Sequence, residues 1–325
     1  MIYDVLVIGG GPSGLSAALA LCRNLRQTVL FDIPLHRNRF ARKMHNVPTW
    51  DHRDPADYRK ASREELDARY PGHVTFVDKE AVTVTKFVQD DKLELFKVTD
   101  SSSNEWTGKK IILAVGSQDI YPELEGYGKL WGSRIYQCLF CDGAEERAVG
   151  SAGVLALDHD AQGLKMGAMN AIMARSILDN KDNVTIFTNG PLPAETIVTD
   201  ETLLLAKSKG IKLDDRQIMR LEAGMNHSTQ VVVRFADGTA TSVGFMYHKP
   251  ATALSRFGRS LAEQLKLELT PTGDIKTVGM FNETTDSGVF ACGDCSTFLK
   301  AVPQAILLGT MAGVGAVHQL IIQDP

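Results

Sequence analysis

The chain has 325 residues, of which 44% are hydrophobic and 23% are charged. This balance is typical of a globular protein with room for two domains, and it excludes disorder as the main state. The 35 Lys and Arg residues against 39 Asp and Glu residues give a formal net charge of -4. Because no block of like charge stands out, we expect no nucleic-acid-binding surface.

The 5 cysteines are too few for a disulfide scaffold in a chain of this length. The N-terminus shows no basic region or cleavage site of a secretory signal, so we expect a cytoplasmic protein. Residues 301–322 come close to the about 20 apolar positions that a membrane-spanning helix needs. Gln304, Thr310 and His318 interrupt this stretch, and its glycines suggest close packing. We therefore expect a buried helix and no membrane contact.

The first residues predict a strand, a turn and a helix. Tyr3–Ile8 is a continuous apolar run, as in a buried parallel strand, and Leu15–Arg23 has helical periodicity. Thr28–Asp32 predicts the second strand of a βαβ unit. The next predicted elements are a helix over 55–69 and strands over 74–77, 81–88, 93–99 and 110–115, with a hairpin loop at 101–104.

A second alternation of strand and helix begins near Gly153. The pattern predicts strands over 154–157, 184–187, 230–235, 241–247 and 288–292, with helices over 164–178 and from Pro303 onward. Residues 117–126 look like a linker because they carry prolines, acids and glycine. We predict an α/β fold of two Rossmann-like, three-layer domains, one inserted in the other. The predicted domains are 1–117 with 249–325, and 118–248.

The first motif is Gly9-x-Gly11-x-x-Gly14, which lies between a predicted strand and a predicted helix. Its glycines permit a tight turn and close approach of the backbone to a pyrophosphate, which the helix N-terminus stabilises. Asp32 ends the next strand and is placed to accept a hydrogen bond from a ribose hydroxyl. The alternative is a glycine-rich turn without a ligand.

The second motif is Cys138-x-x-Cys141, followed by Asp142 and Gly143. In a cytoplasmic protein such a pair is a redox centre or half of a zinc site. Cys292 and Cys295 repeat the spacing, but far more residues separate the two pairs than separate the pairs of a zinc ribbon. We therefore favour the redox interpretation and expect no metal. Asp142 is a plausible proton donor and acceptor, or the N-cap of a helix. Cys22 is expected to be an inert, packed thiol.

The third motif is Gly288–Asp294, in which an Asp follows a strand and a glycine. Such an Asp binds a ribityl or phosphate-linked hydroxyl, with the following helix directing its positive end at the cofactor. Taken alone, Gly293-Asp294 is also an ordinary turn.

Together these motifs resemble the low-molecular-weight thioredoxin reductase family of flavoproteins over nearly the whole chain. Cys138–Gly143 is similar to the family's redox centre, and 111–116 stands at its Ala-Thr-Gly-type strand end. By this resemblance Cys141 faces the flavin and Cys138 exchanges with substrate. The resemblance implies FAD as cofactor, a homodimer, and cofactor contacts from Gly9, Gly11, Pro12, Ser13, Gly14, Asp32, Gly116, Gly293, Asp294, Gln304 and Ala305.

The sequence departs from that family where its inserted domain binds NADPH. After the strand over 154–157 the family has a second glycine-rich turn, but here the residues are Asp158-His159-Asp160-Ala161-Gln162-Gly163. Side chains would fill the space that a pyrophosphate needs, and two carboxylates would repel it. The arginine cluster that the family places after the next strand is also missing, since 188–191 reads Thr-Asn-Gly-Pro. The inserted domain is therefore predicted to be degenerate.

A flavoprotein with a Cys-x-x-Cys pair and no NADPH site resembles the dithiol oxidases of gliotoxin and holomycin biosynthesis. This resemblance, which includes residues 41–70 of the fungal members, implies oxidation of a small-molecule dithiol, such as an epipolythiodiketopiperazine precursor, with O2 as acceptor and H2O2 as product. His45 and Asn46 are candidate substrate residues, His45 being also a second proton carrier. The alternatives are a thioredoxin-type reductase fed by NADPH or ferredoxin, and a flavin-bound redox sensor without turnover.

Overall fold

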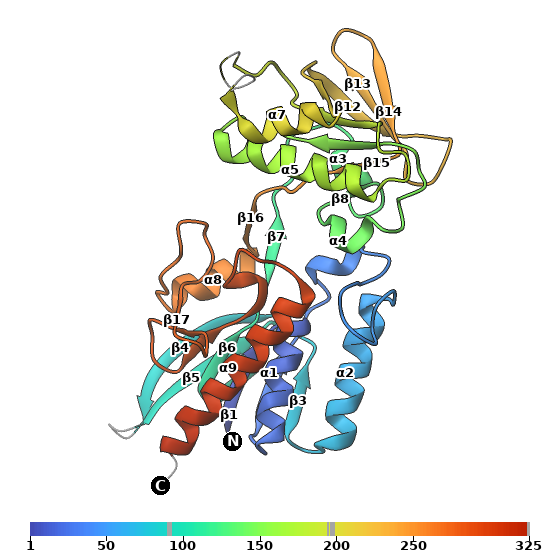
Figure 1. The fold of residues 1–325 in the computed structure, drawn as a ribbon. Coiled ribbons are helices and arrows are strands. Elements are labelled where there is room, and N and C mark those ends of the chain that lie inside the picture. The colour runs from blue at the N-terminus through green and yellow to red at the C-terminus, as the bar shows by residue number, and fades with distance from the viewer. Residues whose placement is uncertain (90–92, 194, 196–198, 324–325) are drawn as a thin grey trace. The chain divides into compact units, whose positions relative to one another are not determined.

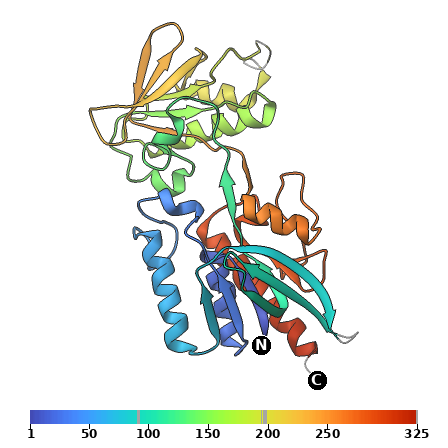
Figure 2. The same cartoon turned by 180° about the vertical axis from the view of Figure 1, so that it is seen from behind.

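A computed structural model of the chain is shown in two views in Figures 1 and 2. It describes every residue except 90–92, 194, 196–198 and 324–325. The chain forms two compact units. The first unit comprises Met1–Arg39, Val47–Asp119 and Thr252–Pro325, and the second comprises Phe40–Asn46 and Ile120–Ala251. The short segment Phe40–Asn46, which the sequence assigned to the first domain, thus belongs to the second unit.

The first unit is built on a sheet whose central strands are parallel. β1 (Ile2–Ile8) lies between β2 (Thr28–Phe31) and β6 (Glu105–Leu113). β3 (Val74–Val77) extends the sheet beyond β2, and β19 (Val289–Ala291) extends it beyond β6. The buried parts of the central strands, such as residues 5–8 of β1 and 111–113 of β6, are apolar because both faces of the sheet are covered.

Helices cover one face of this sheet. α1 (Pro12–Arg23) and α9 (Val302–Gln323) lie side by side against it (Figure 1), and their apolar residues pack with Val5 and Val7 of β1. α1 begins earlier than the predicted Leu15 because proline suits the first turn of a helix. α2 (Pro55–Arg69) also packs against α1 and has the predicted bounds.

Glycines allow α1 and α9 to approach each other closely. A Cβ atom added at Gly309 would lie 2.0 Å from the carbonyl oxygen of Ser13, and one added at Gly313 would lie 2.8 Å from that of Ala17. By length and composition α9 could cross a membrane, but its small-residue face is buried against α1. This packing accounts for the small buried residues of α9, whereas Leu307, Ile321 and Ile322 of the same helix are exposed.

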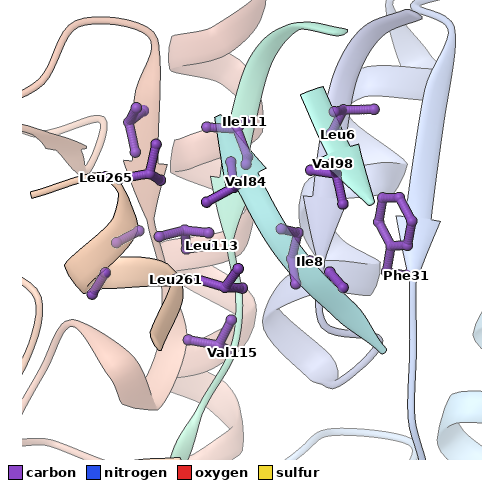
Figure 3. Packing of buried hydrophobic residues seen from close by; sticks show 14 of the residues in the cluster. Leu6, Ile8, Phe31, Val84, Val98, Ile111, Leu113, Val115, Leu261 and Leu265 are labelled. Carbon is purple, nitrogen blue, oxygen red and sulfur yellow. The ribbon is translucent and has the colours of Figure 1, made fainter. Parts of the chain in front are cut away.

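A β-hairpin and a helix cover the opposite face of the sheet. β4 (Ala81–Gln89) and β5 (Leu93–Asp100) pair with each other, and β5 also pairs antiparallel with β6. α8 (Arg256–Gln264) packs beside β4. Figure 3 shows this core, in which Leu6 and Ile8 of β1 meet side chains of the hairpin and of α8. The sheet is therefore the middle of three layers.

The remaining elements of the first unit are short. The predicted linker 117–126 begins instead with a strand, β7 (Ser117–Asp119), because it pairs antiparallel with β16 (Thr252–Leu254) from a distant part of the chain. The other short elements are β17 (Thr277–Val278), β18 (Glu283–Thr284) and the 3-10 turns η1 (Arg37–Phe40) and η2 (Gly293–Cys295).

The second unit contains a parallel sheet of its own. β9 (Ala152–Leu155) lies between β10 (Val184–Phe187) and β15 (Phe245–Tyr247). β11 (Lys212–Asp214) and β8 (Ile135–Tyr136) form the two edges. This α/β arrangement repeats the one at the start of the chain, as predicted.

Helices and a small antiparallel sheet complete the second unit. α5 (Ala161–Ile177) follows β9 and packs against α7 (Glu201–Ser208), which the sequence did not predict. The predicted strand 241–247 is two strands, because the chain leaves β14 (Ala240–Val243) at Gly244 and enters β15 of the other sheet. The other elements of the described residues are β12 (Ile218–Ala223), β13 (Val231–Phe235), α3 (Tyr127–Leu130) and α4 (Leu139–Asp142).

Candidate functional site

The turn between β1 and α1 requires two of its glycines for reasons internal to the protein. Gly9 has φ of 114°, and an added Cβ would lie 2.2 Å from the carbonyl oxygen of Ala114. A Cβ at Gly14 would lie 1.7 Å from the carbonyl oxygen of Gly9. These glycines let β1, β6 and α1 meet closely and bring the start of α1 to the carboxyl edge of the sheet.

Gly11 differs from Gly9 and Gly14 because a side chain at this position would point into open space. No described atom lies within 4 Å of a Cβ built at Gly11. Gly11 is also the N-cap of α1, and among the described residues no side chain caps this helix and none in its first turn is acidic. The helix N-terminus therefore keeps its backbone amides and its positive end for an anion. The residues fit a dinucleotide pyrophosphate.

Asp32 lies beside this turn at the end of β2. Its carboxylate accepts a hydrogen bond of 3.1 Å from the Gly10 amide, and Arg63 and His36 lie 3.8 and 3.7 Å from it. Burial raises the pKa of Asp32 to about 6, although the Gly10 amide and Arg63 oppose the shift. The carboxylate is thus held by the backbone at the place where a ribose hydroxyl is bound in this kind of turn.

The third motif carries an ion-pair cluster. Arg37 binds Asp294 at 3.1 Å and Asp119 at 2.6 Å. Burial raises the pKa of Asp294, and the Arg37 guanidinium opposes that shift. A Cβ at Gly293 would lie 2.5 Å from the Ser13 hydroxyl, so the motif lies against the start of α1.

The structure places the remaining predicted cofactor residues in the same unit. Pro12 opens α1, Gly116 follows β6 with φ of 64°, and Gln304 and Ala305 lie in the first turn of α9, with Ala305 buried. As at Gly11, no described atom lies within 4 Å of a Cβ built at Gly116.

The remaining cysteines are buried in the first unit. Burial raises the pKa of Cys295 to about 12, that of Cys22 to about 11, and that of Cys292 well above its ordinary value. The Cys295 thiol donates to the carbonyl oxygens of Leu113 and Cys292. A zinc ligand must be a thiolate, so this pair has the character of packed, protonated thiols.

In the second unit, Cys138 and Cys141 form a disulfide with their Cα atoms 5.2 Å apart. Cys138 is the N-cap of α4, and both cysteines are half-buried. Phe140 between them is 75% exposed, and the Asn46 side chain donates to its carbonyl oxygen at 3.0 Å. Asn46 therefore fixes the backbone of the disulfide loop, which is a role that the sequence did not assign to it.

Carboxylates surround the disulfide loop. Burial raises the pKa of Asp142 to about 6, the nearby His45 opposes this shift, and Glu145 and Glu146 add to it. His45 lies 3.8 Å from the Glu145 carboxylate. Asp142 and His45 are thus far apart in the sequence but interact electrostatically beside the disulfide loop.

Glu146 is a buried carboxylate that the sequence did not single out. It accepts hydrogen bonds from the Tyr136 hydroxyl at 2.9 Å and from the Thr229 hydroxyl at 2.8 Å. Burial and this carboxylate raise the pKa of Tyr136, so its hydroxyl remains a donor. The Glu146 carboxylate also contributes to the raised pKa of Asp142.

The turn between β9 and α5 differs from the turn between β1 and α1 in one decisive respect. Asp160 is the N-cap of α5, and its carboxylate accepts a hydrogen bond of 2.7 Å from the Gly163 amide. A Cβ at Gly163 would lie 2.5 Å from Asp158, so the turn packs on its own side chains. The position that is left open for an anion at the N-terminus of α1 is occupied by the Asp160 carboxylate at α5.

The residues after β10 also form hydrogen bonds within the protein. The His159 ring lies 2.6 Å from the carbonyl oxygen of Thr188, and the buried Thr188 hydroxyl donates to Gly190. The Asn189 side chain accepts from the Ile218 amide. The residues at which the related family binds the NADPH 2′-phosphate therefore serve the fold, and none of them is basic.

A glycine turn with a free helix N-terminus and a Cys-x-x-Cys disulfide are the two parts of a disulfide oxidoreductase. A family model described as pyridine nucleotide-disulphide oxidoreductase matches residues 3–310. The chain belongs to this family of oxidoreductases, and its thioredoxin reductase-like members bind FAD. FAD is therefore the cofactor, and the glycine turn of the first unit fits its pyrophosphate.

Fungal relatives match the chain over almost its full length. Thioredoxin reductase sirT of Leptosphaeria maculans is 36% identical over 99% of this chain and 96% of its own. Thioredoxin reductase aclD of Aspergillus oryzae is 38% identical over 99% of this chain and 98% of its own. The crystal structure of an oxidoreductase from Agrobacterium tumefaciens matches all of both chains with a TM-score of 0.84 and 27% identity.

Proposed function

We propose that this protein is an FAD-dependent oxidase that converts a small-molecule dithiol, of the epipolythiodiketopiperazine type, to its disulfide, with oxygen as the electron acceptor. The observation that carries the proposal is the contrast between the two βα turns. The N-terminus of α1 has no side-chain cap among the described residues, whereas that of α5 is capped by Asp160. The first suits a dinucleotide pyrophosphate and the second repels one.

The residues that would hold FAD lie in the first unit. Gly11 and the following amides of α1 would bind the pyrophosphate, Asp32 the ribose, and Asp294 a hydroxyl of the ribityl chain. Arg37 keeps Asp294 in place through its ion pair. When bound, FAD supplies two-electron chemistry, accepting electrons from a dithiol and giving them to oxygen to form hydrogen peroxide.

The chemistry of the disulfide balances without a further reagent. A substrate thiolate attacks Sγ of Cys138, which breaks the Cys138–Cys141 bond and forms a mixed disulfide. The second substrate thiolate attacks the substrate sulfur of that mixed disulfide, which closes the product disulfide and releases Cys138. Two protons and two electrons have then left the substrate, and Cys138 and Cys141 have become thiols.

Asp142 is the group that we assign to the protons. A carboxyl whose pKa is about 6 is largely ionised at neutral pH, so it can accept a proton from a substrate thiol. His45, which lowers that pKa, stabilises the carboxylate before it accepts the proton. The exposed Phe140 beside the disulfide offers an apolar surface to the ring of a substrate.

Steady-state oxygen uptake distinguishes the oxidase from the alternatives. With a small dithiol we expect continuous uptake of oxygen and one peroxide for each disulfide formed. A thioredoxin-type reductase would instead consume NADPH or reduced ferredoxin when given a disulfide substrate. A redox sensor would show a single reduction of its cysteines and no turnover.

A further inference from the structure

The second unit contains a pocket that the proposed reaction does not use. Its volume is about 260 Å³, just below the about 300–1,000 Å³ that is usual for small-molecule sites. It lies at the carboxyl end of β9, between the start of α5 and the segment Tyr247–Ala251. Leu155, Met166 and Pro250 contribute apolar surface.

Three polar side chains of the lining are buried and have unpaired groups. Asn170, Tyr247 and His248 are 8%, 5% and 7% exposed. Within the described part of the chain, neither the Asn170 amide nor the Tyr247 hydroxyl has a hydrogen-bond partner, and His248 uses only Nδ1, with the Tyr127 hydroxyl at 2.7 Å. None of these polar atoms is among the fully buried unpaired atoms of the described residues, so they are accessible from the pocket and free to bind a ligand there.

The lining selects against anions. Asp158 and Asp160 are among the lining residues, and the positive end of α5 is already neutralised by the Asp160 cap. Burial raises the pKa of Tyr247 to about 12 and lowers that of His248 to about 4, so both are neutral at physiological pH. Lys249 is the one basic residue other than His248 among the described lining residues, and it is exposed.

The shape of the polar groups selects an amide edge. The Asn170 side chain presents a carbonyl acceptor and an N–H donor side by side. Their complement is an amide with its N–H and carbonyl on the same edge, as in a lactam ring or a primary carboxamide. The Tyr247 hydroxyl and the second nitrogen of His248 add a donor and a further donor or acceptor.

We infer that this pocket binds an uncharged small molecule through a lactam or carboxamide edge, with Asn170 as the central contact. The pocket lies at the turn between β9 and α5, where the related family binds NADPH, and we infer that it takes a different ligand. It is separate from the dithiol chemistry at Cys138 and Cys141, so the inference does not depend on the direction of electron flow.

Calorimetric titration of the whole oxidised flavoprotein tests this inference. The probes are the cyclic dipeptide cyclo(glycyl-phenylalanyl), which has lactam edges, and nicotinamide, which has a carboxamide. We expect at least one to bind with a dissociation constant below about 1 mM, and the one that binds identifies the source of the amide edge. Nicotinate, which replaces the carboxamide by a carboxylate, should bind at least about tenfold more weakly than nicotinamide if nicotinamide binds.

Two variants test whether Asn170 contacts the bound probe. Asn170→Asp keeps the size of the side chain but replaces its donor by a charged acceptor, and it should weaken probe binding by at least about tenfold. Asn180→Asp makes the same change at an exposed position of the second unit and should leave binding unchanged. Circular dichroism and the flavin spectrum verify that both variants are folded.

The inference is overturned if neither probe binds, if Asn170→Asp binds as wild type does, or if nicotinate binds as tightly as nicotinamide. Binding and oxygen uptake are measured separately, so a failure of this inference is distinguishable from a failure of the proposed oxidase activity.

Discussion

The carboxylate of Asp160 accepts a 2.7 Å hydrogen bond from the amide of Gly163 and so occupies the N-terminus of α5. A helix N-terminus carries the equivalent of about half a positive charge, which is what makes it an anion site. At α5 this charge is used by the protein itself. At α1 the corresponding N-cap is Gly11, and the charge is left for the cofactor.

Removing the cap charge should partly restore nucleotide affinity. In Asp160→Ser the hydroxyl still caps α5 but no longer repels a phosphate. We expect NADPH to bind about tenfold more tightly to this variant than to wild type, as measured by calorimetry, because one unfavourable charge interaction is lost. Asp200→Ser makes the same change at the N-cap of α7, where Asp200 accepts from the Leu203 amide, and should leave NADPH affinity unchanged.

Gly11→Asp should remove FAD without unfolding the protein. Its side chain meets open space, so the protein accommodates it, but it fills the approach of the pyrophosphate and adds a like charge. We expect a folded, colourless protein in absorbance and circular dichroism spectra. Gly128→Asp, at an exposed position where a Cβ makes ordinary contact with Tyr121, should stay yellow. A yellow Gly11→Asp variant would contradict the assignment of the turn.

The two cysteines of the disulfide should differ in their spectra. In Cys138→Ser the remaining Cys141 thiolate, if it faces the flavin, should give a long-wavelength absorption band, and Cys141→Ser should lack it. Either variant should lose turnover by orders of magnitude, because neither thiol can be replaced in exchange. Cys22→Ser changes a buried thiol with no role in exchange and should keep its activity. The band in Cys141→Ser alone would reverse the assigned roles.

Asp142 should link activity to pH. Because turnover needs its carboxylate, the rate should rise with pH through about 6 in wild type. Asp142→Asn should lose this rise and about 10²–10⁴-fold in rate. Asp179→Asn, at an exposed position of the same unit, should retain both. An unchanged pH profile in Asp142→Asn would exclude Asp142 as the proton acceptor.

Asp142 should also link stability to pH, but here stability should fall as the pH rises. Since burial raises the pKa of Asp142 from 3.8 to about 6, the folded protein holds the proton more tightly than the unfolded chain. The resulting stabilisation is complete below the unfolded pKa and is lost as the pH rises through about 6. Relative to wild type, Asp142→Asn should gain about 2 kcal/mol in the free energy of unfolding between pH 4 and pH 8. Urea denaturation at the two pH values measures this difference.

Local patterns predicted the parts of the structure that local sequence determines. Three signals each act over a few residues: the apolar run before Gly9, the glycine spacing and the Cys-x-x-Cys motif. The βαβ unit and the disulfide loop could therefore be predicted from the sequence. The ion pair between Arg37 and Asp294 joins residues that are 257 positions apart. No short-range signal marks such a pair, or the buried bonds of Glu146 to Tyr136 and Thr229.

Contacts between segments far apart in the sequence also determine structure that local patterns do not predict. Residues 117–126 were predicted to be a linker because they carry prolines, acids and glycine. Ser117–Asp119 nevertheless form β7, because they pair with β16, which follows the second unit in the sequence. The segment Phe40–Asn46 joins the second unit through tertiary contacts, such as the bond from Asn46 to Phe140. The loss of glycines at 158–160 was visible in the sequence, but the cap that Asp160 forms was not.

The direction of electron flow is tested most directly by following the flavin absorbance after rapid mixing without oxygen. With excess NADPH or NADH the spectrum should stay unchanged for minutes, because the α5 turn has lost its shape and charge for a pyrophosphate. Losing several charge-assisted contacts, each worth about 1.5–3 kcal/mol, weakens binding at least about a thousandfold. A small dithiol should bleach the flavin, and air should restore it with formation of peroxide. Rapid bleaching by micromolar NADPH would contradict the oxidase and establish a reductase.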